Sequence, residues 1–369
     1  MVPPFVYSSI VYASLFAFMA LGLTLTYITT KVPNFAYGSF VTVGLYTAYT
    51  LIKVYKINPY EASPLAFVLG SAVAVAMYLG ILRPLARRGS SLVSLMIATF
   101  GVDVGFIGIL GIYTDYLQNK FGLPDAKQFF QFQADFSIFG LRGMVLVAPL
   151  ALAITTLVLY LLLTRTKFGV AMRASVENPP LAKILGINVE RVYVTSWFLA
   201  GGFAGFSGCL YTLWLPGGTS TGSNLIVEIF ASSILGGLTS IFGAVLGGLA
   251  IGGSEVGLGT DLTTGFGLPG AMVIAGLSVL AGLYVWRRKG TTKKLLSLFL
   301  LGFGVYIILD AALGYPLDFL APSLVNGFGA EAIEYQKGIP LLIMVVTLLV
   351  LPKGLVSLGW GRLIRRRKA

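Results

Sequence analysis

The sequence predicts an all-α integral membrane protein, built as a polytopic helical bundle. Of its 369 residues 56% are hydrophobic and only 11% are charged, whereas a soluble domain carries about 25% charged residues. Apolar stretches of about 18 residues or more recur along the whole chain, and this is the length that a membrane-spanning helix needs. The basic residues gather in short segments beside these stretches, as they do in cytoplasmic loops of membrane proteins.

The composition also excludes several classes of function. The net charge of +12 does not indicate nucleic-acid binding, because no basic stripe with interleaved aromatic residues occurs. The chain has no histidine and a single cysteine, Cys209, which excludes histidine metal sites, Ser-His triads and an intramolecular disulfide. We therefore expect no metal site, no cofactor and no catalytic residue, and we expect that the chain is not an enzyme.

The apolar runs predict the spans in chain order. They cover residues 5–29, 35–52, 64–82, 92–112, 144–163, 192–214, 268–286, 295–313 and 339–356. A further apolar stretch, 226–258, is interrupted by Gly236-Gly237, Gly243 and Gly247-Gly248. The piece before Gly236 would reach only about 15 Å, half of the hydrocarbon core. This stretch therefore predicts a re-entrant pair or two half-helices.

Four basic clusters set the predicted orientation. They lie at 83–88, 165–191, 287–294 and 362–368, and all four are expected on the cytoplasmic side. The loops 113–143 and 314–338, which carry acidic residues, then fall outside. The N-terminus is expected outside and the C-terminus in the cytoplasm. With these sides assigned, the number of predicted crossings requires the stretch 226–258 to enter and leave the membrane on the outer side.

The segment 164–191 is charged and rich in turn residues, although spans flank it on both sides. Asn178 is a good N-cap, Pro179 suits the first helical position and Gly186 is a good C′ residue. These signals predict a helix over about 179–185. It would carry Leu181, Ile184 and Leu185 on one face, with Ala182 beside that face. Because so short a helix is unstable alone, we expect packing to hold it.

The residues of this helix leave two interpretations open. The helix is either a spacer at the level of the lipid headgroups or a projection that docks in a groove on a soluble partner and transmits force.

The stretch 169–188 resembles the cytoplasmic coupling loop of branched-chain amino acid ABC transporter permeases, whose pattern is close to G-R-A-x-R-A-x-A-E-[ND]-x-x-x-A-x-x-x-G-I-[ND]. The matching residues are Gly169, Ala171, Arg173, Ala174, Glu177, Asn178, Ala182, Gly186, Ile187 and Asn188. Val170 stands where the family usually has arginine, and the pair Pro179-Pro180 also departs from the pattern.

Further blocks agree with the same family in order along the chain. They lie at 21–27 with 34–38, at 83–85, at 235–248 and at 351–355. Tyr37 replaces the usual His or Gln, and Ser39 replaces a frequent acidic residue. The resemblance covers most of 5–258 and 335–356, and it implies one permease domain over 1–369. Residues from about 260 to 335 form an extra two-span insertion relative to the family pattern.

The resemblance implies the permease subunit of a prokaryotic plasma-membrane importer for branched-chain or related hydrophobic amino acids. It also implies the partners: two ABC ATPase subunits, a second homologous permease subunit, an extracytoplasmic substrate-binding protein and the lipid bilayer. Because the chain has no G-x-x-x-x-G-K-[ST] phosphate loop, the ATPase subunits would drive its alternating access. The residues expected to couple to them are Arg173, Glu177, Asn178, Ala182, Ile184, Leu185 and Gly186. Relatives also carry urea, amides or other amino acids, so the cargo stays open.

The residues expected along the translocation pathway are Asn34, Phe35, Gly38, Asp103, Glu228, Gly236 and Gly237. Ends of broken helices can bind the carboxylate and ammonium of an amino acid, and ionisable residues inside spans are functional candidates. In the alternative, the glycines only let helices pack closely, Asp103 pairs with a polar group across the bundle, and Glu228 sits at an interface.

A rival class is an ion-coupled secondary transporter or channel, in which Asp103, Glu228 and Glu255 would relay protons or bind sodium. That class accounts for the acidic residues but leaves the helix at 178–186 without a partner.

Overall fold

The structure is a computed structural model that describes part of the chain. The described residues are 4–264 except 134 and 139, then 279, 294, 297–298, 300–306 and 338–350. The chain divides into two compact units, Met1–Gly253 with Pro340–Ala369, and Ser254–Ile339. The second unit contains the predicted insertion 260–335. The predicted spans 268–286 and 295–313 lie mostly outside the described residues, as do the basic clusters at 287–294 and 362–368.

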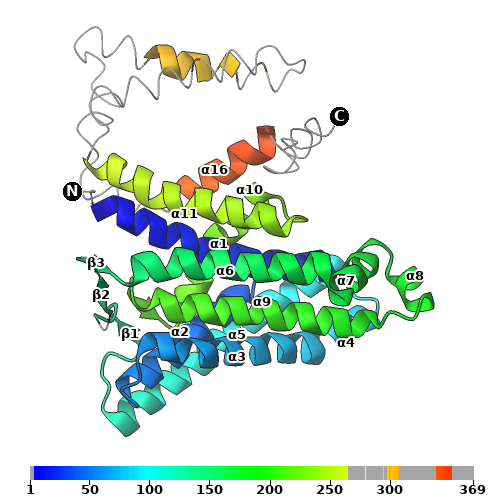
Figure 1. Ribbon diagram of the computed structural model, residues 1–369, viewed down its shortest axis with the longest axis horizontal. Helices are drawn as coiled ribbons and strands as arrows, with labels where there is room; N and C mark the ends of the chain where they lie inside the picture. The colour runs from blue at the N-terminus through cyan, green and yellow to red at the C-terminus, as the bar shows by residue number, and fades with distance from the viewer. Residues whose placement is uncertain are drawn as a thin grey trace. The chain divides into compact units, whose positions relative to one another are not determined.

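The described elements are almost all helical, which confirms the predicted fold class (Figure 1). The helices are α1 Pro4–Thr30, α2 Tyr37–Lys53, α3 Pro59–Met77, the π-helix η1 Tyr78–Leu82, α4 Arg83–Arg87, α5 Leu92–Phe121, α6 Met144–Arg165, α7 Lys167–Glu177, α8 Pro179–Ile184, α9 Val189–Tyr211, α10 Thr221–Gly236, α11 Ile241–Thr264 and α16 Gly338–Val350. The short strands are β1 Gln128–Phe129, β2 Ser137–Ile138, β3 Leu141–Arg142 and β4 Gly217–Gly218. β1 pairs with β4 and β2 with β3, both antiparallel.

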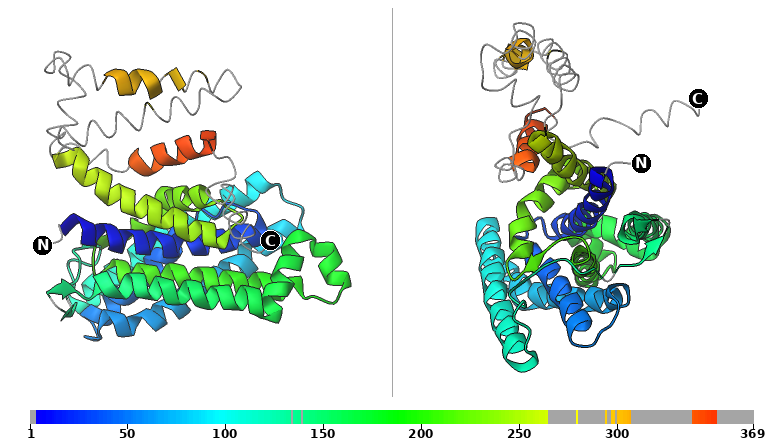
Figure 2. Two further views of the ribbon diagram at one scale, coloured as in Figure 1. Left: turned by 45° about the horizontal axis from the view of Figure 1, so that its top comes forward. Right: turned by 90° about the vertical axis from the view of Figure 1, so that its left-hand side faces the viewer.

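Four of the described helical stretches are long and apolar enough to cross a membrane. They are Val6–Thr30, Pro59–Arg87, Leu92–Phe121 and Met144–Arg165, each of which includes a predicted span or nearly all of one. The stretch Pro59–Arg87 is longer than the predicted span 64–82, because α3, η1 and α4 follow one another without a break. The loop 122–143 with β1, β2 and β3 lies at one end of the bundle, and α7 and α8 lie at the other (Figures 1 and 2).

Helix α9 is the centre of the helix packing. It makes its most extensive contacts with α3, followed by α2 and α1. The contacts are backbone to backbone: a Cβ atom on Gly205 would collide with the carbonyl oxygen of Ala66, and one on Gly44 would collide with that of Gly205. Gly70 and Gly201 face each other in the same way. Small residues allow such close approach between membrane helices.

The glycine-interrupted stretch 226–258 differs from the prediction. Helix α10 starts at Thr221 and has 16 residues, so it extends about 24 Å rather than half a span. Helix α11 continues through Gly243, Gly247 and Gly248, so the prediction that these glycines interrupt the helix is wrong. Gly247 approaches the backbone of α10, and Gly248 approaches that of α1. Their role is close packing, and the break is confined to the segment between α10 and α11, where Gly237 has a φ of +97°.

A pair of alanine substitutions tests this packing. We expect Gly205→Ala to lower the stability of the purified protein by about 1–3 kcal/mol, because the new methyl group forces α9 away from α3. Gly108→Ala is the matched control, because a Cβ there meets nothing within 4 Å and alanine favours helix. The measurement is the apparent unfolding temperature in detergent. Equal unfolding temperatures for the two variants would contradict the role of Gly205.

Candidate functional site

The predicted helix in the segment 164–191 is present as α8. The side chain of Asn178 accepts a hydrogen bond from the backbone N–H of Leu181 at 3.1 Å, and Pro179 takes the first helical position. At the other end Gly186 has a φ of +79°, and the N–H of Ile187 donates to the carbonyl oxygen of Ala182 at 2.9 Å. This is the 6→1 bond of a Schellman ending, so the cap signals in the sequence are confirmed.

Helix α8 is anchored by one small residue and presents three large apolar ones. Ala182 is 1% exposed, whereas Leu181 is 50%, Leu185 is 70% and Ile184 is 81% exposed. Ala182 therefore packs within its own chain and does not face outward as the candidate docking residue beside the apolar face. The three large side chains form a projecting apolar face, which we call the α8 face. Leu181 belongs to this face although it is absent from the set of residues expected to couple.

Helix α7 is held against the end of α6, and this fixes the base from which α8 projects. The guanidinium of Arg173 donates to the carbonyl oxygen of Leu163, which satisfies a carbonyl at the end of α6. Gly169 lies so close to the same carbonyl that a Cβ atom would collide with it. Arg173 thus ties α7 to α6, and the side chains of Glu177 and Asn178 are exposed beside the α8 face.

A second group of candidate residues surrounds a buried carboxylate. Asp103 on α5 is 6% exposed. Its Oδ1 accepts a hydrogen bond from Ser39 Oγ on α2 at 2.5 Å, and its Oδ2 accepts one from Ser223 Oγ on α10 at 2.7 Å. Asp103 therefore pairs with polar groups across the bundle and joins three helices. We call Asp103, Ser39 and Ser223 the Asp103 cluster.

The segment 34–38 lies beside this cluster. The backbone N–H of Phe35 donates to Thr99 Oγ1 on α5 at 3.1 Å, and the Phe35 ring lies 5.2 Å from that of Phe230 on α10. Gly38 meets the backbone of Gly222, the residue before Ser223. Asn34 is fully buried, and its Nδ2 donates no hydrogen bond within the described part of the chain. These three pathway candidates are thus brought to the junction of α2, α5 and α10.

The remaining candidates lie elsewhere along α10. Glu228 is buried, at 3% exposed, and lies about 7.5 Å further along the helix axis than Ser223. Gly236 ends the helix, about 20 Å from Ser223 along the axis, and packs against Gly243 of α11. Gly236 and Gly237 are therefore not part of the Asp103 cluster, and their local role is the turn into α11 and its close packing.

Sequence reasoning did not find Ser223 and Thr99. Hydroxyl residues inside membrane helices commonly bond a carbonyl of their own helix, as Thr47 and Ser196 do here. Thr99 also donates to a carbonyl of its own helix, that of Met96, while it accepts from Phe35. The sequence carries no signal that identifies the hydroxyls with a second, distant partner, because that partner depends on which segment is the neighbour.

The helices and the α8 face define a polytopic helical membrane protein with a projecting helix at one end. The family model described as "Branched-chain amino acid transport system / permease component" matches residues 5–277. The chain therefore belongs to the branched-chain amino acid transport permease family.

Three relatives illustrate this membership. The probable branched-chain amino acid transport permease protein LivH of Methanocaldococcus jannaschii is 37% identical over 97% of this chain and 93% of its own length. The high-affinity branched-chain amino acid transport system permease protein BraD of Pseudomonas aeruginosa is 27% identical over 68% of this chain and 83% of its own length. The protein LivM of the same kind of system in Escherichia coli is 25% identical over 75% of this chain and 67% of its own length. No solved structure gave a significant match.

The alignments with these relatives cover different shares of this chain, and this decides whether they must include the predicted insertion 260–335. Since the alignment with the Methanocaldococcus protein covers 97% of this chain, it runs across residues 260–335, whereas BraD is matched over 68% of the chain.

The caps of α8 can be tested directly. We expect Asn178→Ala to weaken α8 by about 1 kcal/mol, because the N–H of Leu181 loses its acceptor. Asn178→Asp is the matched control, because aspartate keeps an acceptor at the N-cap. The measurement is amide hydrogen exchange of residues 179–187, which should rise in the alanine variant alone. The same exchange in wild type, Asn178→Ala and Asn178→Asp would contradict the capping role.

Proposed function

We propose that this chain is the membrane-spanning, non-catalytic subunit of an ATP-driven importer for branched-chain or closely related hydrophobic amino acids. Two ATPase subunits would bind the α8 face from the cytoplasm, a second homologous permease subunit would complete the pathway, and an extracytoplasmic binding protein would deliver the cargo. The names of the relatives support the cargo. Escherichia coli has two permease proteins with such names, LivH and LivM, and this supports a second permease subunit.

The α8 face is the observation that carries this proposal. Three large apolar side chains are exposed on a short helix that projects beyond the bundle, between polar and charged residues such as Lys183. Exposing these apolar side chains to water is unfavourable in free energy. Exposed apolar anchors of this kind are typical of a docking site for another protein. A spacer at the headgroup level would not need the Schellman ending and the buried Ala182 that fix its direction.

The route from α8 into the bundle is short. Helix α9 starts at Val189, directly after α8. Its Glu190 pairs with Arg83 at 2.5 Å and with Arg87 at 3.1 Å, which ties the start of α9 to α4. A displacement of α8 would therefore move α9, the helix against which α1, α2 and α3 pack. The outward-open and inward-open states would be two packings whose balance ATP binding changes.

The test uses the chain reconstituted in vesicles with its ATPase subunits and binding protein, with uptake of labelled leucine as the readout. We expect L181S with I184S to lower the affinity for the ATPase and the uptake at least tenfold, at about 1–2 kcal/mol for each apolar anchor lost. Y55S is the control. Tyr55 is 65% exposed like the residues of the α8 face, but it follows the end of α2, where Lys53 pairs with Asp125 of the loop 122–143 at the opposite end of the bundle. Uptake driven by a proton or sodium gradient without ATPase subunits would instead support the ion-coupled class.

The Asp103 cluster is the proposed place where the pathway meets the amino acid. Its carboxylate would attract the ammonium group of the cargo. The Nδ2 of Asn34, which donates to no group in the described part of the chain, would donate to the carboxylate of the cargo. The buried carboxylate of Glu228 would extend the same polar path along α10.

We expect Asp103→Asn to lower uptake at least tenfold through the loss of a charge-assisted contact, with little change in unfolding temperature. Asp115→Asn is the matched control on the same helix, because Asp115 is half-exposed and pairs with Lys127. Glu228→Gln tests the extension of the path. If Asp103→Asn lowers the unfolding temperature but leaves uptake per folded molecule unchanged, Asp103 serves helix packing alone. If Glu228→Gln leaves the uptake kinetics unchanged, Glu228 is not part of the pathway.

A further inference from the structure

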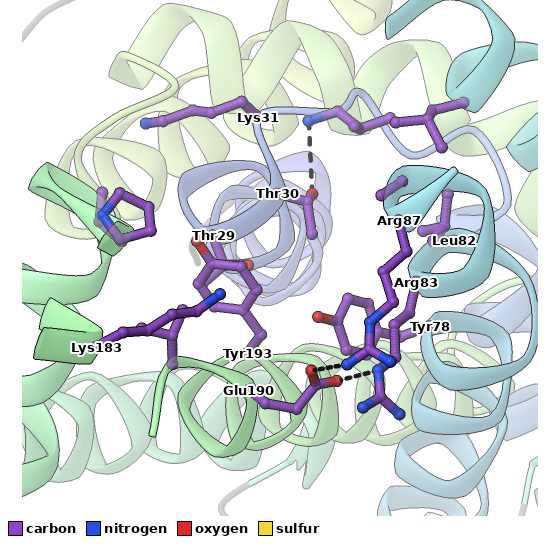
Figure 3. A pocket seen from close by; sticks show the side chains of 16 residues that line it. Thr29, Thr30, Lys31, Tyr78, Leu82, Arg83, Arg87, Lys183, Glu190 and Tyr193 are labelled. Carbon is purple, nitrogen blue, oxygen red and sulfur yellow. Dashed lines mark hydrogen bonds and ion pairs between the residues drawn. The ribbon is translucent and has the colours of Figure 1, made fainter. Parts of the chain in front are cut away.

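A cavity of about 440 Å³ lies beside α8 at the basic end of the bundle. Its walls come from the end of α1, from η1 and α4, from α8 and from the start of α9. Figure 3 shows Arg83, Arg87 and Glu190 on one side, Lys183 reaching in from the opposite side, and Thr29 and Tyr193 between them. Arg83, Arg87 and Glu190 also tie α9 to α4, but the cavity itself has been given no ligand.

The charges that line the cavity are unbalanced. Four cationic residues contribute to it, Lys31, Arg83, Arg87 and Lys183, against one carboxylate, Glu190. Both oxygens of that carboxylate are engaged by the two arginines, at 2.5 Å and 3.1 Å. The ammonium groups of Lys31 and Lys183 form no ion pair within the described part of the chain; Lys31 lies 5.9 Å from the ring of Tyr27. The cavity thus offers two cations that its own carboxylate does not neutralise.

This imbalance favours an anion over the zwitterionic cargo. A free amino acid needs an anionic partner for its ammonium group, and the charge of Glu190 is already paired with two guanidinium groups. A phosphate group suits the lining, because its several oxygens accept from ammonium and guanidinium groups and from the hydroxyls of Tyr78 and Tyr193 together. The volume lies in the range of sites for small organic molecules, so the phosphate would be part of a larger molecule.

We propose that this cavity binds a phosphate group, carried either by an anionic phospholipid or by a soluble organic phosphate. Basic pockets between membrane helices at the cytoplasmic boundary are suited to anionic headgroups, and this end of the bundle carries the basic clusters at 83–88 and 165–191. A phosphate held by Lys31 and Lys183 would bridge the end of α1 to α8 and hold α8 in one direction. Because the test measures ligand binding and not uptake, failure of this proposal is distinct from failure of the proposed transport function.

The experiment uses the full chain purified in detergent. Native mass spectrometry would measure retention of dioleoylphosphatidylglycerol against the zwitterionic dioleoylphosphatidylcholine, and the unfolding temperature would be followed with glycerol 1-phosphate against glycerol. We expect K31Q with K183Q to weaken binding of the anionic ligand at least about tenfold. K56Q with K120Q is the matched control, because it removes the same charge from the ends of α2 and α5 that lie away from the cavity.

The two arms distinguish the sources of the phosphate. Selective retention of phosphatidylglycerol alone assigns the cavity to a lipid headgroup, and a rise in unfolding temperature with glycerol 1-phosphate assigns it to soluble phosphates. Ala86→Phe fills the cavity without a change in charge and provides a second test if the lysine variant is unstable. Binding no stronger than that of the neutral comparators overturns the proposal. So does an equal loss in both lysine pairs, and so does unchanged binding in Ala86→Phe.

Discussion

The arrangement of this membrane protein depends on the close approach of helix backbones around α9. Gly201, Gly205 and Gly208 of α9 meet the backbones of α3 and α2 at distances that no side chain allows. Between membrane helices there is little hydrophobic driving force, so packing contacts and interhelical hydrogen bonds hold the bundle together. The same approach recurs where Gly38 meets Gly222 and where Gly236 meets Gly243. The contact of Gly38 with Gly222 brings the polar side chains of α2 and α10 within reach of Asp103 on α5.

The Asp103 cluster is a consequence of this packing. Because Gly38 lets α10 approach α2, Ser39 and Ser223 lie on either side of Asp103 and donate to its two oxygens. A buried carboxylate is strongly disfavoured in an apolar surrounding unless hydrogen bonds satisfy it. Two hydroxyl donors partly meet this requirement and leave the remaining lone pairs for a further donor.

At the end of the molecule that carries α8, apolar side chains are exposed, whereas around Asp103 a charged one is buried. There the fold exposes Leu181, Ile184 and Leu185 and buries the small Ala182. The two arginines on Glu190 fix the start of α9 beside α4, so α8 is joined to a rigid base rather than to a free loop. The connection from α8 to the bundle therefore runs through the start of α9 and its paired charges at Glu190.

The sequence by itself determined the fold class, the four spans at α1, α3, α5 and α6, and the ends of α8, because hydropathy and helix caps are local properties. The Asn178 cap and the left-handed Gly186 follow from residues within one helical turn, and the family pattern over 169–188 follows from the same residues. Only the tertiary structure decided the partners of Asp103, the inward direction of Ala182 and the role of the glycines in α11. Those glycines resemble helix breakers in the sequence, yet they lie inside a continuous helix because the neighbouring backbones of α10 and α1 occupy the space of the missing side chains. Which neighbour a residue meets depends on how distant helices cross, and one chain's local pattern does not contain that information.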